Sequence, residues 1–314
     1  MMAEAEAIID AHHHIWRQRD LPWLVGSMVP RIFGPYEAIR RDYSMAEFRA
    51  EAEAAGIVAS IYVQTNWRPE DAVREVEWVE CAATGDAWPA AIVGFCDLGR
   101  PDASLILDRM HAASPRLRGI RQQLHWHENP QYRFVARPDL MADAQWRRGL
   151  AAAADRGFLF ELQIFMGQAE PACALLRDFP SVSFVLAHAG MPEDISTEGF
   201  AAWREGLARL ASYPNLATKL SGLGTFLHRN DPGMIGRVVR EALSLFGADR
   251  CLFGSNFPIE KLWTDYRSLL AAHLAALAYL PTEVRQAVLA GNARRLYRLA
   301  EFGHSRTLSA GALP

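Results

Sequence analysis

The sequence lacks the features that mark several classes of protein. Its four cysteines are scattered and include no Cys-x-x-Cys pair, so neither a disulfide framework nor a cysteine metal site is expected. No apolar run approaches the ~20 residues that span a bilayer, and the first residues lack the basic and apolar regions of a signal peptide. A net charge of −3 gives no reason to expect nucleic acid or an anionic membrane as a partner. These absences predict a cytoplasmic protein with buried free thiols.

A dinucleotide-binding fingerprint is also absent. No Gly-x-Gly-x-x-Gly follows the first predicted strand, which argues against a Rossmann fold, and we expect no organic cofactor. What the chain does have is length and apolar content: 314 residues, of which 50% are hydrophobic and 22% charged. These proportions are typical of a globular enzyme with a large core. We expect one domain over residues 1–300 and a short tail over residues 301–314.

Strand-like and helix-like patterns alternate along almost the whole chain. Amphipathic stretches such as Met45–Ala55 and Pro232–Phe246 repeat apolar residues at helical spacing, as helices that cover a core do. Eight β–α alternations without a linker predict the α/β class, as a single (β/α)8 barrel of the TIM type. The predicted strands are Ile8–His14, Val58–Asn66, Ala91–Leu98, Leu117–Leu124, Phe158–Phe165, Ser183–His188, Leu216–Ser221 and Arg250–Asn256.

The first predicted strand ends in a run of three histidines that follows Asp10 and Ala11. Successive side chains of a strand point to opposite faces, so Asp10, His12 and His14 are expected on one face and His13 on the other. Two imidazoles that converge at a strand end form half of a metal site, or a cluster for acid–base chemistry. The alternative is a remnant of a purification tag, but this run follows an apolar strand and not a linker. We expect a site here.

Polar residues also follow several other predicted strands. The carboxyl ends of barrel strands meet at one face, where barrel enzymes bind their substrates. Two long segments, 17–44 and 125–143, follow strands one and four there, and loops of this length are usually functional. We therefore expect one polar pocket for a small-molecule substrate, with tryptophans as flat walls. Besides His12 and His14, the residues expected at this pocket are Arg121, Gln163, His188 and Asn256, with His125, His127, Trp67 and Trp126 as further substrate contacts.

Three short segments at the ends of predicted strands resemble motifs of the amidohydrolase superfamily. They are Asp10-x-His12-x-His14, His188-Ala189-Gly190 and Gly254-Ser255-Asn256-Phe257-Pro258, in this order and at strand ends. Within the superfamily, the chain is similar to the branch that holds 2-pyrone-4,6-dicarboxylate hydrolase and sugar lactonases such as L-fuconolactonase and L-rhamnono-lactonase. The resemblance extends from about Ile8 to Leu299. It implies a barrel of the metal-dependent hydrolase type and a hydrolase that opens a lactone.

The resemblance also implies roles for individual residues. His12 and His14 would be metal ligands or their metal-free equivalents, and His188 would contact the substrate carbonyl or help to hold the metal. Arg121 would bind a carboxylate or the polarised lactone oxygen, for which its planar fork of donors is suited. The chain departs from the wider superfamily at Arg121, which replaces a carboxylated lysine, and at Gln163, which replaces a further histidine. These departures imply one divalent ion, zinc, or no metal at all.

Asn256 stands where the superfamily usually has an aspartate that takes a proton from the attacking water. An amide is not a general base, so another group must take this proton or the chemistry must differ. A metal that lowers the pKa of water would leave Asn256 only a positioning role. The candidate bases are a histidine (His12, His14, His125 or His188) and Glu260, which would have to reach in from the next loop.

The main prediction is a hydrolase that opens a lactone of a sugar acid, or of a carboxylated intermediate of aromatic degradation, by water attack at the ester carbonyl. Its substrate would be a small anionic or sugar-like molecule. One alternative is a metal-dependent decarboxylase on the same barrel, which needs no water-activating base and would suit Asn256. The other is a barrel that only binds a ligand, and the presence of the histidines and Arg121 argues against it.

Overall fold

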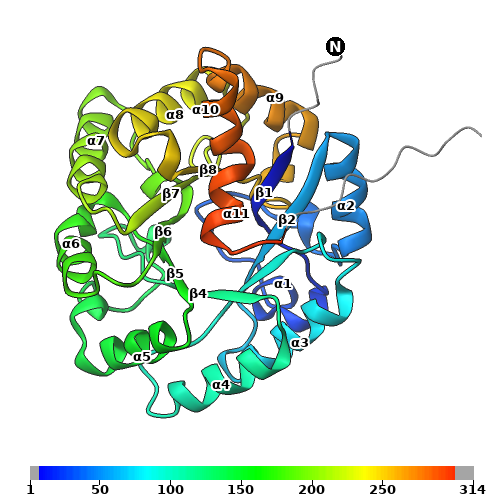
Figure 1. Cartoon of the computed structure of the whole chain (residues 1–314), viewed down its shortest axis with the longest axis vertical. Helices are drawn as coiled ribbons and strands as arrows, with labels where there is room; N and C mark the ends of the chain where they lie inside the picture. The colour runs from blue at the N-terminus through cyan, green and yellow to red at the C-terminus, as the bar shows by residue number, and fades with distance from the viewer. Residues whose placement is uncertain (1–6, 301–314) are drawn as a thin grey trace, which may run out of the picture.

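Eight parallel strands lie side by side in the order in which they occur in the chain. The computed structural model describes residues 7–300, so the predicted tail over residues 301–314 lies outside the described residues. Helices alternate with the strands around the ring (Figure 1), and the predicted (β/α)8 barrel of the TIM type is confirmed. The strands are β1 (Ile8–His13), β2 (Ile57–Val63), β3 (Ala91–Gly94), β4 (Leu117–Gln123), β5 (Leu159–Gln163), β6 (Phe184–Leu186), β7 (Leu216–Leu220) and β8 (Cys251–Phe253).

Contacts between β1 and the segment after β8 bring the two ends of the sheet together. The backbone N–H of Asn256 donates to the carbonyl of His12 at 2.7 Å, and that of His14 donates to the carbonyl of Phe257 at 2.8 Å. His13 and Phe257 form a parallel bridge. The predicted neighbourhood of the first and last strands is therefore present, and it places the strand-one histidines beside Asn256.

Helices cover the outside of the barrel, and local sequence signals begin several of them. Their bounds are α1 (Pro22–Val25), α2 (Met45–Ala54), α3 (Ala72–Ala82), α4 (Ala103–Ala113), α5 (Ala144–Asp155), α6 (Ala169–Asp178), α7 (Thr197–Ala211), α8 (Pro232–Phe246), α9 (Tyr266–Leu277), α10 (Thr282–Gln286) and α11 (Asn292–Leu296), with a π-helical turn at Ala287–Gly291. Side chains of Ser44, Asp143, Asp231 and Asp265 accept hydrogen bonds from first-turn N–H groups of α2, α5, α8 and α9. Pro232 begins α8, where its missing N–H costs no hydrogen bond.

Two apolar layers hold the barrel together. The larger one fills the space between the sheet and the helices and includes the fully buried Trp146 and Phe160. The smaller one contains strand residues such as Val185 and Leu252, together with Tyr297 from the end of the chain. In Figure 1, α11 lies in front of the ring beside β1.

No helix of the described part of the chain is both long and apolar enough to cross a membrane. All four cysteines fall within this part and are free; Cys96 and Cys251 are buried as predicted, whereas Cys81 is exposed and Cys173 is half-buried. Burial raises the pKa of the Cys96 thiol to about 12, so this thiol stays protonated and unreactive at neutral pH.

Candidate active site

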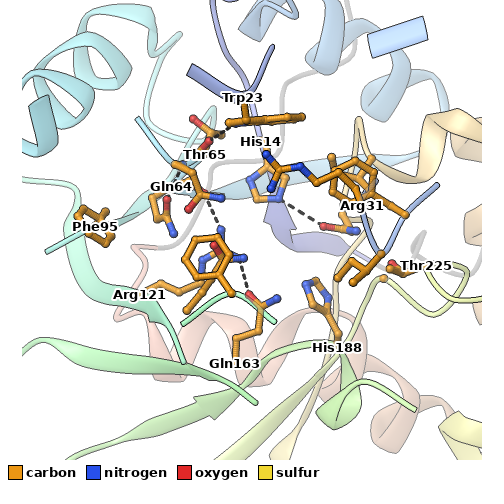
Figure 2. Close-up of a pocket in the computed structure, with 18 of the residues that line it drawn as sticks. His14, Trp23, Arg31, Gln64, Thr65, Phe95, Arg121, Gln163, His188 and Thr225 are labelled. Carbon is orange, nitrogen blue, oxygen red and sulfur yellow. Dashed lines mark hydrogen bonds between the residues drawn. The ribbon is translucent and has the colours of Figure 1, made fainter. Parts of the chain in front are cut away.

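A cavity of about 420 Å³ opens at the carboxyl end of the barrel. Strand ends form its floor, and the segment after β1 forms much of its roof, with contributions from the loops after β4 and β7 (Figure 2). Three arginines (Arg31, Arg68 and Arg121) are among the lining residues, which include no aspartate or glutamate. The charged side chains of the lining are therefore all cationic or imidazole groups.

His14 and Asn256 meet at the floor, where β1 lies beside the end of β8. His14 Nδ1 donates to the carbonyl of Val63 at 2.7 Å, and its Nε2 lies 3.3 Å from Oδ1 of Asn256. Because a carbonyl only accepts, the proton of neutral His14 is on Nδ1 and Nε2 carries a lone pair. Burial, helped by the positive charge of Arg121, lowers the pKa of His14 to about 3. His14 is thus a neutral imidazole at neutral pH.

Strand one does not alternate as strictly as the sequence predicts. Its pairing with β2 shifts register between Asp10 and His13. Asp10 accepts a hydrogen bond at 2.8 Å from the hydroxyl of Tyr266 in α9, on the outer side of the barrel. The His13 ring stacks on Phe48 of α2, with ring centres 3.8 Å apart. His13 points away from the cavity as expected, but the prediction that Asp10 shares a face with the other two histidines was wrong.

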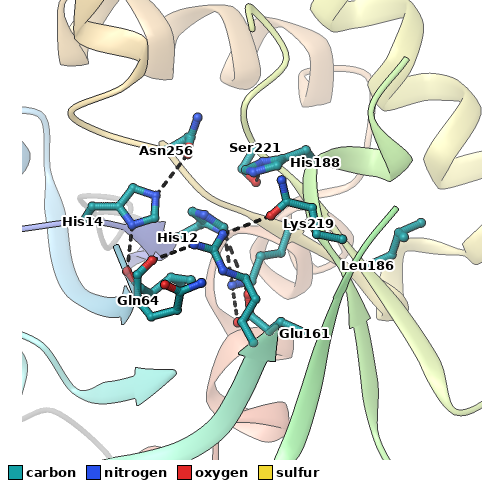
Figure 3. A network of polar contacts seen from close by, with 12 residues as sticks. His12, His14, Gln64, Glu161, Leu186, His188, Lys219, Ser221 and Asn256 are labelled. Atoms are coloured by element: carbon teal, nitrogen blue, oxygen red, sulfur yellow. Dashed lines mark hydrogen bonds and ion pairs between the residues drawn. The ribbon is translucent and has the colours of Figure 1, made fainter. Parts of the chain in front are cut away.

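His12 lies beneath the cavity and is not among its lining residues, which corrects its expected position (Figure 3). Its Nδ1 is 3.4 Å from Nζ of Lys219. Lys219 donates to Glu161 at 2.6 Å, and the hydroxyl of Tyr297 donates to the same carboxylate oxygen at 2.6 Å. Burial lowers the pKa of Lys219 to about 8. Burial and the nearby Lys219 also hold the pKa of His12 well below its usual value, so His12 is neutral.

Arg121 is fixed at the floor by two acceptors and keeps other donors free. Its Nη2 donates to the carbonyl of Gln64 at 2.6 Å, and its Nη1 donates to Oε1 of Gln163 at 3.2 Å. Nε of Arg121 and Nε2 of Gln64 are buried and have no hydrogen-bond partner among the described residues. Burial lowers the pKa of Arg121 to about 10, and the side chain stays cationic at neutral pH. Unpartnered donors of this kind suit a ligand rich in acceptor oxygens.

His188 reaches the cavity from a strained turn after β6. His188 and Ala189 have φ values of 55° and 49°, in the left-handed region that side chains rarely adopt. Nδ1 of His188 lies 3.0 Å from Oγ of Ser221, so Nε2 is the nitrogen left for a ligand. Only glycine fits at position 222, because a Cβ there would lie 2.6 Å from Nδ1 of His188. Burial and Arg121 hold the pKa of His188 well below its usual value.

The structure brings only some of the other predicted substrate contacts to the cavity. Trp67 and Gln163 line it, whereas His125, His127 and Trp126 do not. His125 is buried against aromatic rings beside the cavity, and the other two lie farther along the same loop. β4 ends before these three residues, so strand alternation no longer sets the direction of their side chains. Their expected position is corrected for that reason.

Sequence reasoning missed most of the roof and one residue under the floor. Trp23, Arg31 and Phe33 come from the segment after β1, which was predicted only as a long functional loop, and Phe226 comes from the loop after β7. No strand or helix period marks these residues in the sequence. Lys219 is the only charged residue of β7, and a lone charge within a buried strand was the signal for a buried ion pair.

Glu260 lies directly behind Asn256 and does not line the cavity. Its carboxylate accepts from Nε1 of Trp263 at 2.9 Å and from the hydroxyl of Thr225 at 3.4 Å. Burial raises the pKa of Glu260 to about 8, although hydrogen bonds from Trp263 and Asn256 act in the opposite direction. A carboxyl group held in this way supports Asn256 from behind and does not reach the substrate.

The donor set at the cavity offers a divalent ion imidazole nitrogens and no carboxylate. Of the three predicted ligands, His14 and His188 present a ring nitrogen to the cavity, and Nε2 of the buried His12 has no hydrogen-bond partner among the described residues, while its Nδ1 lies 3.4 Å from Nζ of Lys219. Within residues 7–300, no group of three or more His, Cys, Asp or Glu residues is arranged to hold a metal. Arg121 and Lys219 are buried cations beside this cluster, and Glu161 pairs with Lys219 at 2.6 Å, so the net positive charge that opposes a divalent cation comes mainly from Arg121.

Comparison with known proteins places the chain in a family. The sequence model of the family described as Amidohydrolase matches residues 9–299, and the chain belongs to this family. The uncharacterised protein y4mH of Sinorhizobium fredii is 34% identical over 295 residues, which cover 93% of this chain and 99% of that protein. L-fucono-1,5-lactonase of Burkholderia multivorans is 30% identical over 311 residues, which cover 95% of this chain and 98% of that protein.

A solved structure shares the fold. The crystal structure of an amidohydrolase from Burkholderia multivorans with bound zinc matches with a TM-score of 0.79 and 27% identity, and covers 94% of this chain and 100% of that one. The resemblance to the amidohydrolase superfamily that the strand-end motifs indicated is thus confirmed. The protein is an enzyme of this superfamily and is similar to lactonases.

Proposed function

We propose that this enzyme opens a lactone by attack of water on the ester carbonyl. The observation that carries the proposal is the cavity floor, where a buried arginine with unpartnered donors lies close to two neutral histidines. The similarity to L-fucono-1,5-lactonase supports the same type of reaction. Arginine as the only charged residue type in the lining supports an anionic or sugar-like substrate. Lactones of sugar acids and carboxylated intermediates of aromatic degradation both meet this description.

Each group at the floor has a role in the proposed reaction. Arg121 donates to the lactone carbonyl oxygen, where negative charge develops as water attacks. His188 contacts the same carbonyl, and Nε2 of His14 accepts a proton from the attacking water. The tetrahedral intermediate then collapses: the bond between the carbonyl carbon and the ring oxygen breaks, and the ring oxygen takes the proton from His14. The product is the open hydroxy acid.

The same arrangement gives Asn256 a role that does not require basicity. Once His14 gains a proton, its Nε2–H can donate to Oδ1 of Asn256, which lies 3.3 Å away. The carbonyl of Val63 already accepts from Nδ1 of the same ring. Both nitrogens of the imidazolium would then have acceptors, and Glu260 accepts from the Asn256 amide behind them. In this proposal Asn256 is a positioning residue, and no step needs a metal.

A screen of sugar-acid lactones and pyrone carboxylates, with and without a chelator, tests the proposal. Proton release should report the opening of at least one lactone, and the chelator should leave the rate unchanged. His188→Ala should lower kcat by about 100-fold or more, the usual scale for acid–base or oxyanion groups. Release of carbon dioxide with a firmly bound divalent ion, and no lactone opening, would favour the decarboxylase alternative. Tight ligand binding without any turnover would favour the barrel that only binds.

A further inference from the structure

The roof of the cavity carries an arginine that the proposed reaction does not use. The backbone of Arg31 is fixed from two sides, because its carbonyl accepts from the N–H of Gly34 at 3.0 Å and from Nε2 of Gln131 at 3.3 Å. The next carbonyl, that of Ile32, accepts from Nε2 of His228 at 3.1 Å. Gly34 has a φ of 72°, and a Cβ there would lie 3.0 Å from the His228 ring. Loops after β1, β4 and β7 therefore hold this part of the roof in one place.

The side chain of Arg31 reaches into the cavity toward Trp23 (Figure 2). Its guanidinium carbon is 5.9 Å from the centre of the Trp23 ring. Arg17 and Arg41 of the same segment each pair with a carboxylate at 2.5 Å, but Arg31 forms no ion pair with any described residue. Its Nε is buried and has no hydrogen-bond partner among residues 7–300. Arg31 is therefore a cation at the cavity whose donors are available to a ligand.

Much of the remaining wall is aromatic. Trp23, Phe33, Trp67 and Phe226 line it, and Nε1 of Trp23 donates to the carbonyl of Thr65 at 2.9 Å, which fixes the indole ring. The rings of this wall offer few partners for the hydroxyl groups of a polyol, whose hydrogen bonds with water would have to be replaced by the polar lining residues such as Asn66, Gln123 and Thr225. A flat apolar ring would instead bury both of its faces.

We propose that Arg31 forms a second anion subsite at the roof, and that the substrate is a lactone with a flat apolar body and a carboxylate remote from its ester carbonyl. This inference rests on the proposed lactonase function for the role of the floor. Arg121 donates to the carbonyl oxygen of the lactone, and the aromatic wall packs against its flat apolar ring. Arg31 binds the remote carboxylate by charge-assisted hydrogen bonds. The substrate thereby supplies the anionic partner that Arg31 does not have within the described chain.

The test measures kcat/KM of the full chain with two lactones. One is dihydrocoumarin, and the other is a dihydrocoumarin that bears a carboxylate on its aromatic ring. The wild type should prefer the carboxylated lactone. Arg31→Met should lower kcat/KM for that lactone by about tenfold to hundredfold, mainly through KM, and leave the neutral lactone unaffected. Arg31→Lys keeps the charge and should restore part of the preference. Arg19→Met, an exposed arginine of the same segment outside the cavity, should change neither value.

A binding measurement separates this subsite from the proposed reaction. Titration of tryptophan fluorescence with 4-(3-amino-3-oxopropyl)benzoate, whose side-chain amide can occupy the floor, and with the neutral diamide reports affinity without turnover. A preference for this ring carboxylate that Arg31→Met abolishes supports the subsite even if the enzyme opens no lactone. Equal affinity of the wild type for the carboxylate and the diamide would overturn it. The subsite would also be overturned if Arg31→Met opened the carboxylated lactone with the same kcat/KM as the wild type. In that case the proposed lactonase function would remain supported.

Discussion

Asn256→Asp changes a single group at the cavity floor and tests its proposed role directly. Asn256 is only 5% exposed, and the cavity lining holds no carboxylate. Two unit charges about 5 Å apart repel by about 3 kcal/mol at an effective dielectric constant of roughly 20. A new carboxylate would oppose an anionic substrate or the developing oxyanion by this amount, which corresponds to roughly a 100-fold loss in kcat/KM. It would also remove the amide donor from Glu260.

The assay measures kcat and KM of wild type and Asn256→Asp with a carboxylated and a neutral lactone. We expect the larger loss with the carboxylated lactone. Asn66→Asp is a matched control, because Asn66 also lines the cavity and has a φ of 62°, close to the 59° of Asn256. Asn66 is more exposed, so solvent should screen its new charge and the loss should be smaller. A clear rise in turnover with Asn256→Asp would refute the reasoning, because the aspartate would then be restoring a missing general base.

Three further predictions concern other groups of the site. Arg121→Met should lower kcat by about 100- to 1000-fold in the same assay, because a donor to the oxyanion is lost; a change confined to KM would place Arg121 in ground-state binding only. Lys219→Met should lower the free energy of unfolding in urea by about 3–5 kcal/mol, because Glu161 is left buried and unpaired, and adding Glu161→Gln should recover part of it. A Lys219→Met variant whose urea unfolding curve has the same midpoint and slope as that of the wild type would contradict the predicted loss of stability. Glu260 has a pKa of about 8 in the folded protein against 4.5 as the ordinary value, so its contribution to stability is full at low pH and is lost as pH rises through this window. The free energy of unfolding of the wild type should therefore fall, relative to Glu260→Gln, between about pH 5 and about pH 8 in urea titrations, and a constant difference would exclude the shifted pKa.

The barrel itself could be predicted from the sequence because its signals are local. Apolar residues at strand and helix spacing mark each element, and every predicted strand is present. The predicted first and last residues of the strands were less accurate. The last strand was predicted as Arg250–Asn256, but β8 spans Cys251–Phe253, because Asn256 pairs instead with the backbone of His12 in β1. Tertiary hydrogen bonds of this kind leave no periodic signal in the sequence.

Part of the floor was predictable for the same reason as the barrel. The parallel strands put Arg121, His188 and Asn256 at one end of the ring, and the alternation of strand one separated His13 from His14. Alternation failed where pairing changes register, which turned Asp10 outward. It also failed beyond the ends of strands, as for the residues after β4.

The rest of the site depends on contacts between segments that are far apart in the chain. Lys219 of β7 lies 3.4 Å from Nδ1 of His12 in β1 and pairs with Glu161 of β5, so the charge beside His12 is set by strands that are far apart in the chain. Arg31 lines the roof because His228 and Gln131, from two other loops, hold its backbone. Secondary structure follows from neighbours in sequence, whereas the direction and charge state of a buried side chain follow from whatever the fold packs against it.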